Sequence, residues 1–86
     1  MDIKYHVGIK FLDLTEITID ELRESQSRIE QLAINNGRMF TFRPKNSPLA
    51  DVYYGFLQES QAIALLKDIH GPGISHTTYL NPQSPL

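Results

Sequence analysis

The stretch from Ile3 to Phe11 alternates between two kinds of side chain. Its odd-numbered positions are apolar, and its even-numbered positions are polar or glycine. A period of two residues, carried by β-branched and aromatic side chains, is typical of a strand with one buried face. The pattern therefore predicts a strand and assigns its two faces. The expected buried face holds Ile3, Tyr5, Val7, Ile9 and Phe11, and the expected open face holds Lys4, His6, Gly8 and Lys10.

The residues after this strand carry the signals of a capped helix. Thr18 is a favourable N-cap, and Glu21 three residues later completes a capping box. Gly37 suits the left-handed conformation in which many helices end. These signals predict a helix that begins after Thr18 and ends before Gly37. Its apolar stripe consists of Leu22, Ile29, Leu32 and Ala33.

The rest of the chain predicts three more strands and a second helix, for which Ser60 is the expected cap. The predicted elements are a strand over 38–43, a strand over 52–58, a helix over 61–70 and a strand over 74–80. This order is that of the ferredoxin-like βαββαβ arrangement, an α+β fold with a four-stranded antiparallel sheet and two helices on one face. We expect a single domain over residues 1–80, with the first and third strands central, and a flexible tail over 81–86.

Composition excludes several kinds of chemistry. The 86 residues include no cysteine, which excludes disulfides, thiolate metal sites and thiol catalysis. The formal net charge of −2 argues against a strongly basic nucleic-acid binder. The chain has no apolar run long enough to span a bilayer and no signal-peptide pattern, so we expect a cytoplasmic protein.

No pattern of catalytic or metal-binding residues stands out. The histidines His6, His70 and His76 lack the spacing of a helical metal site, although the first and fourth strands could bring His6 and His76 together. Asp13 and Glu16 follow the first strand, but no second signal of a metal site accompanies Asp13, so we interpret them as ordinary loop carboxylates. The chain also lacks a glycine-rich phosphate loop and a nucleophile motif. We therefore expect no enzymatic activity, no cofactor and no metal.

The segment Tyr54-Gly55-Phe56-Leu57 resembles the aromatic-glycine-aromatic-aliphatic part of the third strand in RNA-recognition-motif domains. The likeness covers the order of the elements and these four residues. It implies that Tyr54 and Phe56 lie on the open face and stack on the bases of single-stranded RNA, a contact worth ~1–3 kcal/mol per base.

The alternative interpretation buries the same aromatic residues. If Val52, Tyr54 and Phe56 face the helices, they join the core together with Phe40 and Phe42. This arrangement is favoured because it buries more apolar surface, at ~1.5–3 kcal/mol for each large side chain. The open face then holds Tyr53, Gly55 and Leu57 beside Lys4, His6, Gly8, Lys10, Met39, Thr41 and Arg43. Such a mixed face is typical of a protein interface or a dimer.

These observations predict a small non-enzymatic binding module, a regulator or inhibitor that binds a protein partner. We expect it to use the open face and the loop over residues 43–48, a protruding finger that holds cations between prolines. The alternatives are a single-stranded RNA-binding domain and a face-to-face homodimer that binds a small ligand. The expected partner-binding residues are Lys4, His6, Lys10, Met39, Arg43, Lys45, Tyr53 and Leu57.

Overall fold

Four strands form one antiparallel sheet in the order β2-β3-β1-β4. The computed structural model describes residues 5–81, so Ile3, Lys4 and most of the expected tail lie outside the described residues. The central position of β1 and β3 confirms the expectation for the first and third strands. The elements are β1 (Tyr5–Phe11), α1 (Ile19–Asn35), β2 (Phe40–Phe42), β3 (Val52–Phe56), α2 (Glu59–Asp68) and β4 (Ile74–Leu80).

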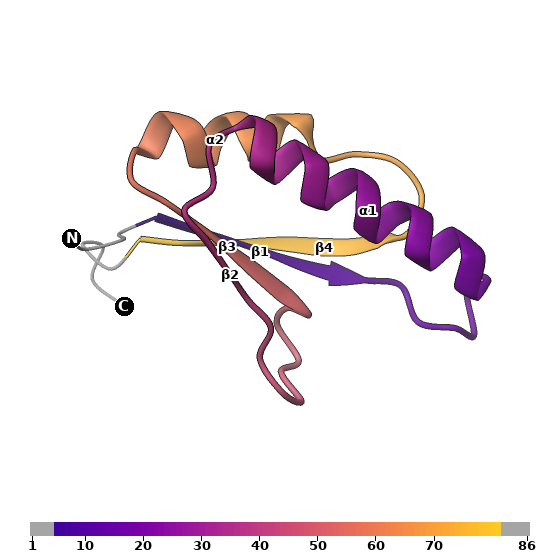
Figure 1. The fold of residues 1–86 in the computed structure, drawn as a ribbon. Helices are drawn as coiled ribbons and strands as arrows, with labels where there is room; N and C mark the ends of the chain where they lie inside the picture. Colours follow the sequence, from indigo (N-terminus) through magenta and orange to yellow (C-terminus); the bar gives the residue numbers. More distant parts are fainter. Residues whose placement is uncertain (1–4, 82–86) are drawn as a thin grey trace.

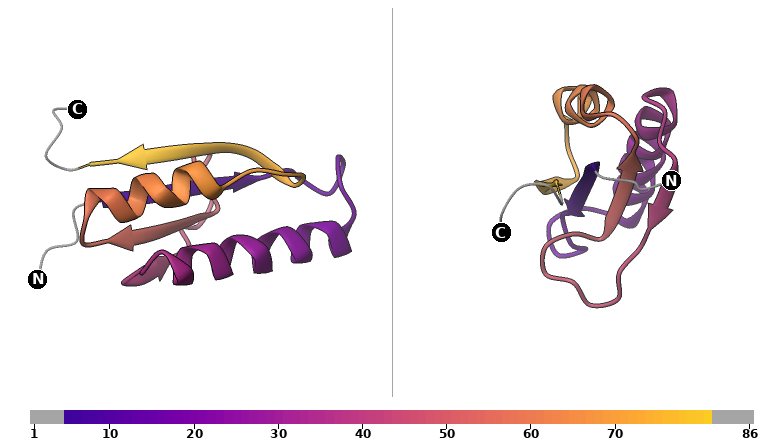
Figure 2. Two further views of the ribbon diagram at one scale, coloured as in Figure 1. Left: turned by 90° about the horizontal axis from the view of Figure 1, so that it is seen from above. Right: turned by 90° about the vertical axis from the view of Figure 1, so that its left-hand side faces the viewer.

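Both helices lie on the same face of the sheet (Figure 1). Viewed from above, α2 lies over the central strands and α1 runs along the β2 side of the sheet (Figure 2). We call the face that carries the helices the helix face, and the opposite one the open face. The long loop between β2 and β3 projects from the open face (Figure 1).

The ends of α1 are those that the sequence predicts. The Thr18 backbone N–H donates to Glu21 Oε1 at 2.9 Å, and the Glu21 N–H donates to Thr18 Oγ1 at 3.2 Å, so the capping box is present. These bonds satisfy N–H groups that have no partner within the helix. At the other end, Gly37 has a φ of 87°, in the left-handed region that glycine enters without strain.

Several boundaries differ from the prediction, among them the end of β3, at Phe56 instead of residue 58, and the end of α2, at Asp68 instead of residue 70. Strand β2 is shorter than the expected 38–43, and α2 begins at Glu59, two residues before the expected start. The cap of α2 is Gln58 instead of Ser60, and its N–H donates to Gln61 Oε1 at 3.1 Å. Because Gln58 supplies the cap, β3 ends at Phe56 and the chain turns immediately into the helix.

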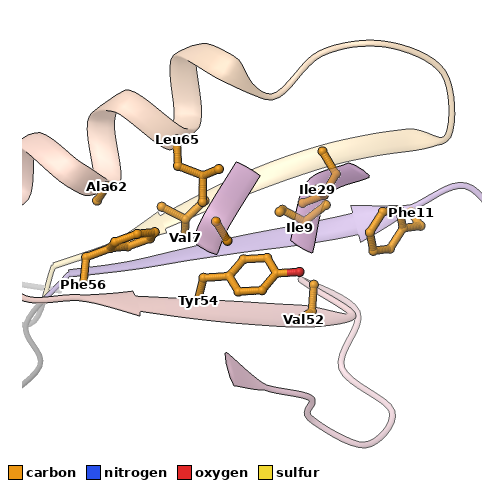
Figure 3. Close-up of a cluster of buried hydrophobic side chains, with 10 residues drawn as sticks. Val7, Ile9, Phe11, Ile29, Val52, Tyr54, Phe56, Ala62 and Leu65 are labelled. Atoms are coloured by element: carbon orange, nitrogen blue, oxygen red, sulfur yellow. The ribbon is translucent and has the colours of Figure 1, made fainter. Parts of the chain in front are cut away.

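The core lies between the sheet and the two helices (Figure 3). From β3, the side chains of Val52, Tyr54 and Phe56 point toward the helices and are between 0% and 3% exposed. The core interpretation of these three residues is therefore confirmed, and the implied stacking of Tyr54 and Phe56 on bases is wrong. The other members of the core are Val7, Ile9, Phe11, Ile29, Ala33, Ala62 and Leu65.

The orientation of β2 is opposite to the expectation. Phe40 pairs with Gly55, Thr41 with Tyr54 and Phe42 with Tyr53. Directly opposed residues in an antiparallel pair point to the same face, so Thr41 shares the helix face with Tyr54. Phe40 and Phe42 consequently lie on the open face instead of in the core, and the Phe42 side chain is 54% exposed.

Candidate functional site

Paired residues of the four strands form two cross-strand rows on the open face. One row runs from Phe42 through Tyr53 and Gly8 to Thr78, and the other from Phe40 through Gly55 and His6 to Leu80. The apolar and aromatic side chains of these rows gather on one surface, which we call the aromatic patch. It consists of His6, Phe40, Phe42, Tyr53 and Leu80.

Glycine in the central strands lets the rings of the patch approach the sheet and one another. Gly55 lies between His6 and Phe40 in its row, and the two rings meet above it. Their centroids are 5.6 Å apart with an interplanar angle of 73°, a T-shaped contact. In the neighbouring row, a Cβ atom on Gly8 would lie 2.5 Å from Cε1 of Tyr53. The Tyr53 ring therefore rests directly on the backbone of Gly8.

The loop between β2 and β3 is fixed to the other end of the open face. Lys10 Nζ donates to the Ser47 carbonyl oxygen at 3.3 Å and to Asp51 Oδ1 at 3.0 Å, while Asp51 Oδ2 accepts from the Phe11 N–H at 2.9 Å. From β4, Nε2 of His76 lies 3.0 Å from the Leu49 carbonyl oxygen. The expected finger is thus tied to β1 and β4 at its base.

The arginines around β2 turn away from the open face. Arg38 Nη2 lies 3.1 Å from Glu30 Oε1, and Arg43 Nη2 lies 3.9 Å from Glu30 Oε2. Glu30 belongs to α1, so the expected position of Arg43 on the open face is wrong. The cause is again the orientation of β2, which places the alternate residues Thr41 and Arg43 toward the helices. Burial, together with the nearby Glu30 carboxylate, raises the pKa of Tyr54 above its ordinary value.

The other predicted site residues are found in several places. His6, Lys10 and Tyr53 come from strand positions that face the open side. Leu57 directly follows β3 and is 36% exposed, and Met39 directly precedes β2 and is 51% exposed. Lys45 is an exposed loop residue, and Lys4 lies outside the described residues.

Sequence reasoning missed Phe40, Phe42 and Leu80 as members of the patch. The alternation around Phe40 and Phe42 does not decide which face is buried. Each of the two alternating sets contains both apolar and polar residues, namely Arg38, Phe40 and Phe42 in one and Met39, Thr41 and Arg43 in the other. Leu80 also has no clear local signal, because the sequence of β4 does not alternate; its pairing with His6 shows that it belongs to the patch.

Within residues 5–81, no group of three histidine or carboxylate side chains could hold a metal ion. His6 and His76 occupy different rows of the open face, opposite Leu80 and Lys10 respectively, so the sheet does not bring them together. The Asp13 carboxylate accepts hydrogen bonds from the side chain and backbone of Thr15, and these bonds lower its pKa. No helix among the described residues is long and apolar enough to cross a membrane.

Comparison of the chain with protein-family models, with curated protein sequences and with solved structures finds no significant match.

Proposed function

We propose that the protein is a small non-enzymatic binding module that holds a protein partner against the aromatic patch. The observation that carries this proposal is the gathering of His6, Phe40, Phe42, Tyr53 and Leu80 on the open face, where neither helix covers them. Aromatic side chains are enriched in protein interfaces and contribute much of their binding energy. The partner would therefore present apolar side chains to this patch.

The charges around the patch favour a protein over a nucleic acid. Binding to a phosphate backbone depends on cations that replace its counterions. Within the described strands, the open face carries one lysine, Lys10, and its charge is neutralised by an ion pair with Asp51. Arg38 and Arg43 are directed toward Glu30 on the opposite side. The rings of Tyr53, Phe40 and Phe42 are also able to stack on the bases of single-stranded RNA. The experiment therefore has to distinguish protein binding from RNA binding.

We also propose that the domain is ferredoxin-like. The strand order, with β1 and β3 in the centre, and the position of both helices on one face support this assignment. The open face, which no helix covers, is then a surface that the fold leaves for a partner.

The proposal is tested with two matched variants. Phe42→Asp places a charge in the patch, whereas Ile34→Asp places the same charge on α1, where the Ile34 side chain is 45% exposed. Proteins captured from native cells by the wild-type chain are purified, and their binding to each variant is measured by calorimetry. A true partner loses at least about tenfold in affinity with Phe42→Asp and keeps its affinity for Ile34→Asp.

Equal binding of every captured protein to both variants would overturn the proposal. A mixed-sequence RNA oligonucleotide, titrated at low salt, provides the second arm. The patch would be assigned to RNA instead if Phe42→Asp abolished RNA binding and no captured protein lost affinity with that variant.

A further inference from the structure

The two edge strands of the sheet differ in how well they are protected against pairing. An exposed edge presents unpaired N–H and C=O groups, and soluble proteins limit this hazard with short strands, charges or proline. Strand β2 has two of these features, because it is three residues long and Arg43 directly follows it. Proline does not distinguish the two edges, since Pro44 follows β2 at the same spacing at which Pro82 follows β4. Its free edge is a poor template for another strand.

Strand β4 has none of these devices over its last five residues. It is seven residues long and contains no Lys, Arg, Asp, Glu or Pro. One irregularity in its pairing with β1 lies near its start, between the partners of Lys10 and Phe11, and the pairing is regular from His76 to Leu80. No strand within residues 5–81 pairs with its outer side, and α2 packs over β1 and β3 (Figure 2). A regular, uncharged edge of this length is a site for strand addition.

We propose that the outer edge of β4 pairs with β4 of a second copy of this chain. The two strands would run antiparallel about a two-fold axis at Thr78, which extends the antiparallel pairing that the sheet already uses throughout. The dimer would contain one continuous eight-stranded sheet. This inference goes beyond the proposed binding function, and either one can fail alone.

The residues of β4 suit a copy of themselves better than a charged partner strand. In the register centred on Thr78, Thr78 faces its own copy and His76 faces the copy's Leu80, both on the open face. On the helix face, Thr77 is opposite the copy's Tyr79. Thr–Thr pairs and aromatic–β-branched pairs stabilise neighbouring antiparallel strands, and no like charges meet across the axis. The register also covers Leu80, whose side chain is 37% exposed in the single chain.

The arrangement has a consequence for the open face. A two-fold axis perpendicular to the sheet keeps all four helices on one side and both open faces on the other. The two aromatic patches would then lie on one surface, with the paired β4 strands between them. A partner with two apolar segments could bind both copies at once, with the gain that linked sites provide.

The test measures the mass of the full-length chain across a range of concentrations by sedimentation equilibrium. We expect a dimer of twice 9.8 kDa. Thr78→Lys and Thr78→Glu each place two like charges at the axis, so each should raise the dissociation constant by about tenfold or more. An equimolar mixture of the two variants should form mixed dimers, because opposite charges then face each other across the axis. Native mass spectrometry detects these mixed dimers.

Two controls complete the design. Ser27→Lys adds the same charge on the exposed side of α1, and Phe42→Ser alters the other edge of the sheet; both should leave the dimer unchanged. A monomer at every concentration, a dimer insensitive to both Thr78 variants, or a dimer that Phe42→Ser dissociates would overturn the proposal. If a Thr78 variant fails to fold, hydrogen exchange of the wild-type chain decides, since exchange in residues 76–80 that does not slow with concentration also overturns it.

Discussion

The rings of His6 and Phe40 are in contact although their strands are not neighbours in the sheet. Strand β3 lies between them, and Gly55 is the residue of β3 that pairs with both. Because Gly55 has no side chain, the two rings can meet above it with their centroids 5.6 Å apart. This contact places Phe40 on the open face, and it joins the edge strand β2 to the central strand β1.

The first prediction concerns the two faces of the sheet. Phe56→Ala should lower the free energy of unfolding by about 3–5 kcal/mol, because the side chain is fully buried and its removal leaves a cavity. Phe42→Ala should cost about 1 kcal/mol or less, since more than half of this side chain is already exposed. Urea unfolding of both variants measures the difference. A larger loss for Phe42→Ala than for Phe56→Ala would contradict the register of β2.

The elements with strong local signals could be predicted from the sequence. The alternation up to Phe11 and the Thr18–Glu21 capping box each specify a structure through neighbouring residues, and both are present. Strand β4 also has the predicted bounds, Ile74–Leu80. In these segments a local rule and the tertiary packing agree, so the prediction did not depend on knowledge of distant contacts.

The orientation of β2 could not be predicted in this way. A strand of three residues has too few positions to distinguish its faces, and a shift of one residue reverses every side chain. The contacts that go with the observed orientation are all distant in the sequence: Glu30 on α1 pairs with Arg43, and Thr41 lies beside Tyr54 of β3. This reversal explains why the expected open face held Tyr53, while Phe40 and Phe42 were expected in the core.

The second prediction concerns the close contact between Gly8 and Tyr53. Gly8→Ala should destabilise the chain by about 1–3 kcal/mol, because the added Cβ atom would lie 2.5 Å from the Tyr53 ring and 3.0 Å from Cβ of Ala50. Tyr53→Ala removes the nearer obstacle. In that background, the cost of Gly8→Ala should fall, and thermal unfolding of the two single variants and the double variant measures the coupling. Strict additivity would show that the ring does not rest on Gly8.

The third prediction uses the alkaline pH dependence of stability. The pKa of Tyr54 in the folded chain is raised above its ordinary value of 10.0 by burial and by the Glu30 carboxylate. Above pH 10 the unfolded chain therefore releases the Tyr54 proton while the folded chain retains it. The contribution of the protonated Tyr54 hydroxyl to the free energy of unfolding is thus complete below pH 10 and is lost as the pH rises above it. Tyr54→Phe has no proton to release and should lack this part of the alkaline decline. Urea unfolding of the wild type and the variant from neutral to alkaline pH compares the two slopes. Parallel slopes would contradict the burial of the Tyr54 hydroxyl beside Glu30, and a flatter slope for Tyr54→Phe would establish it as the group responsible.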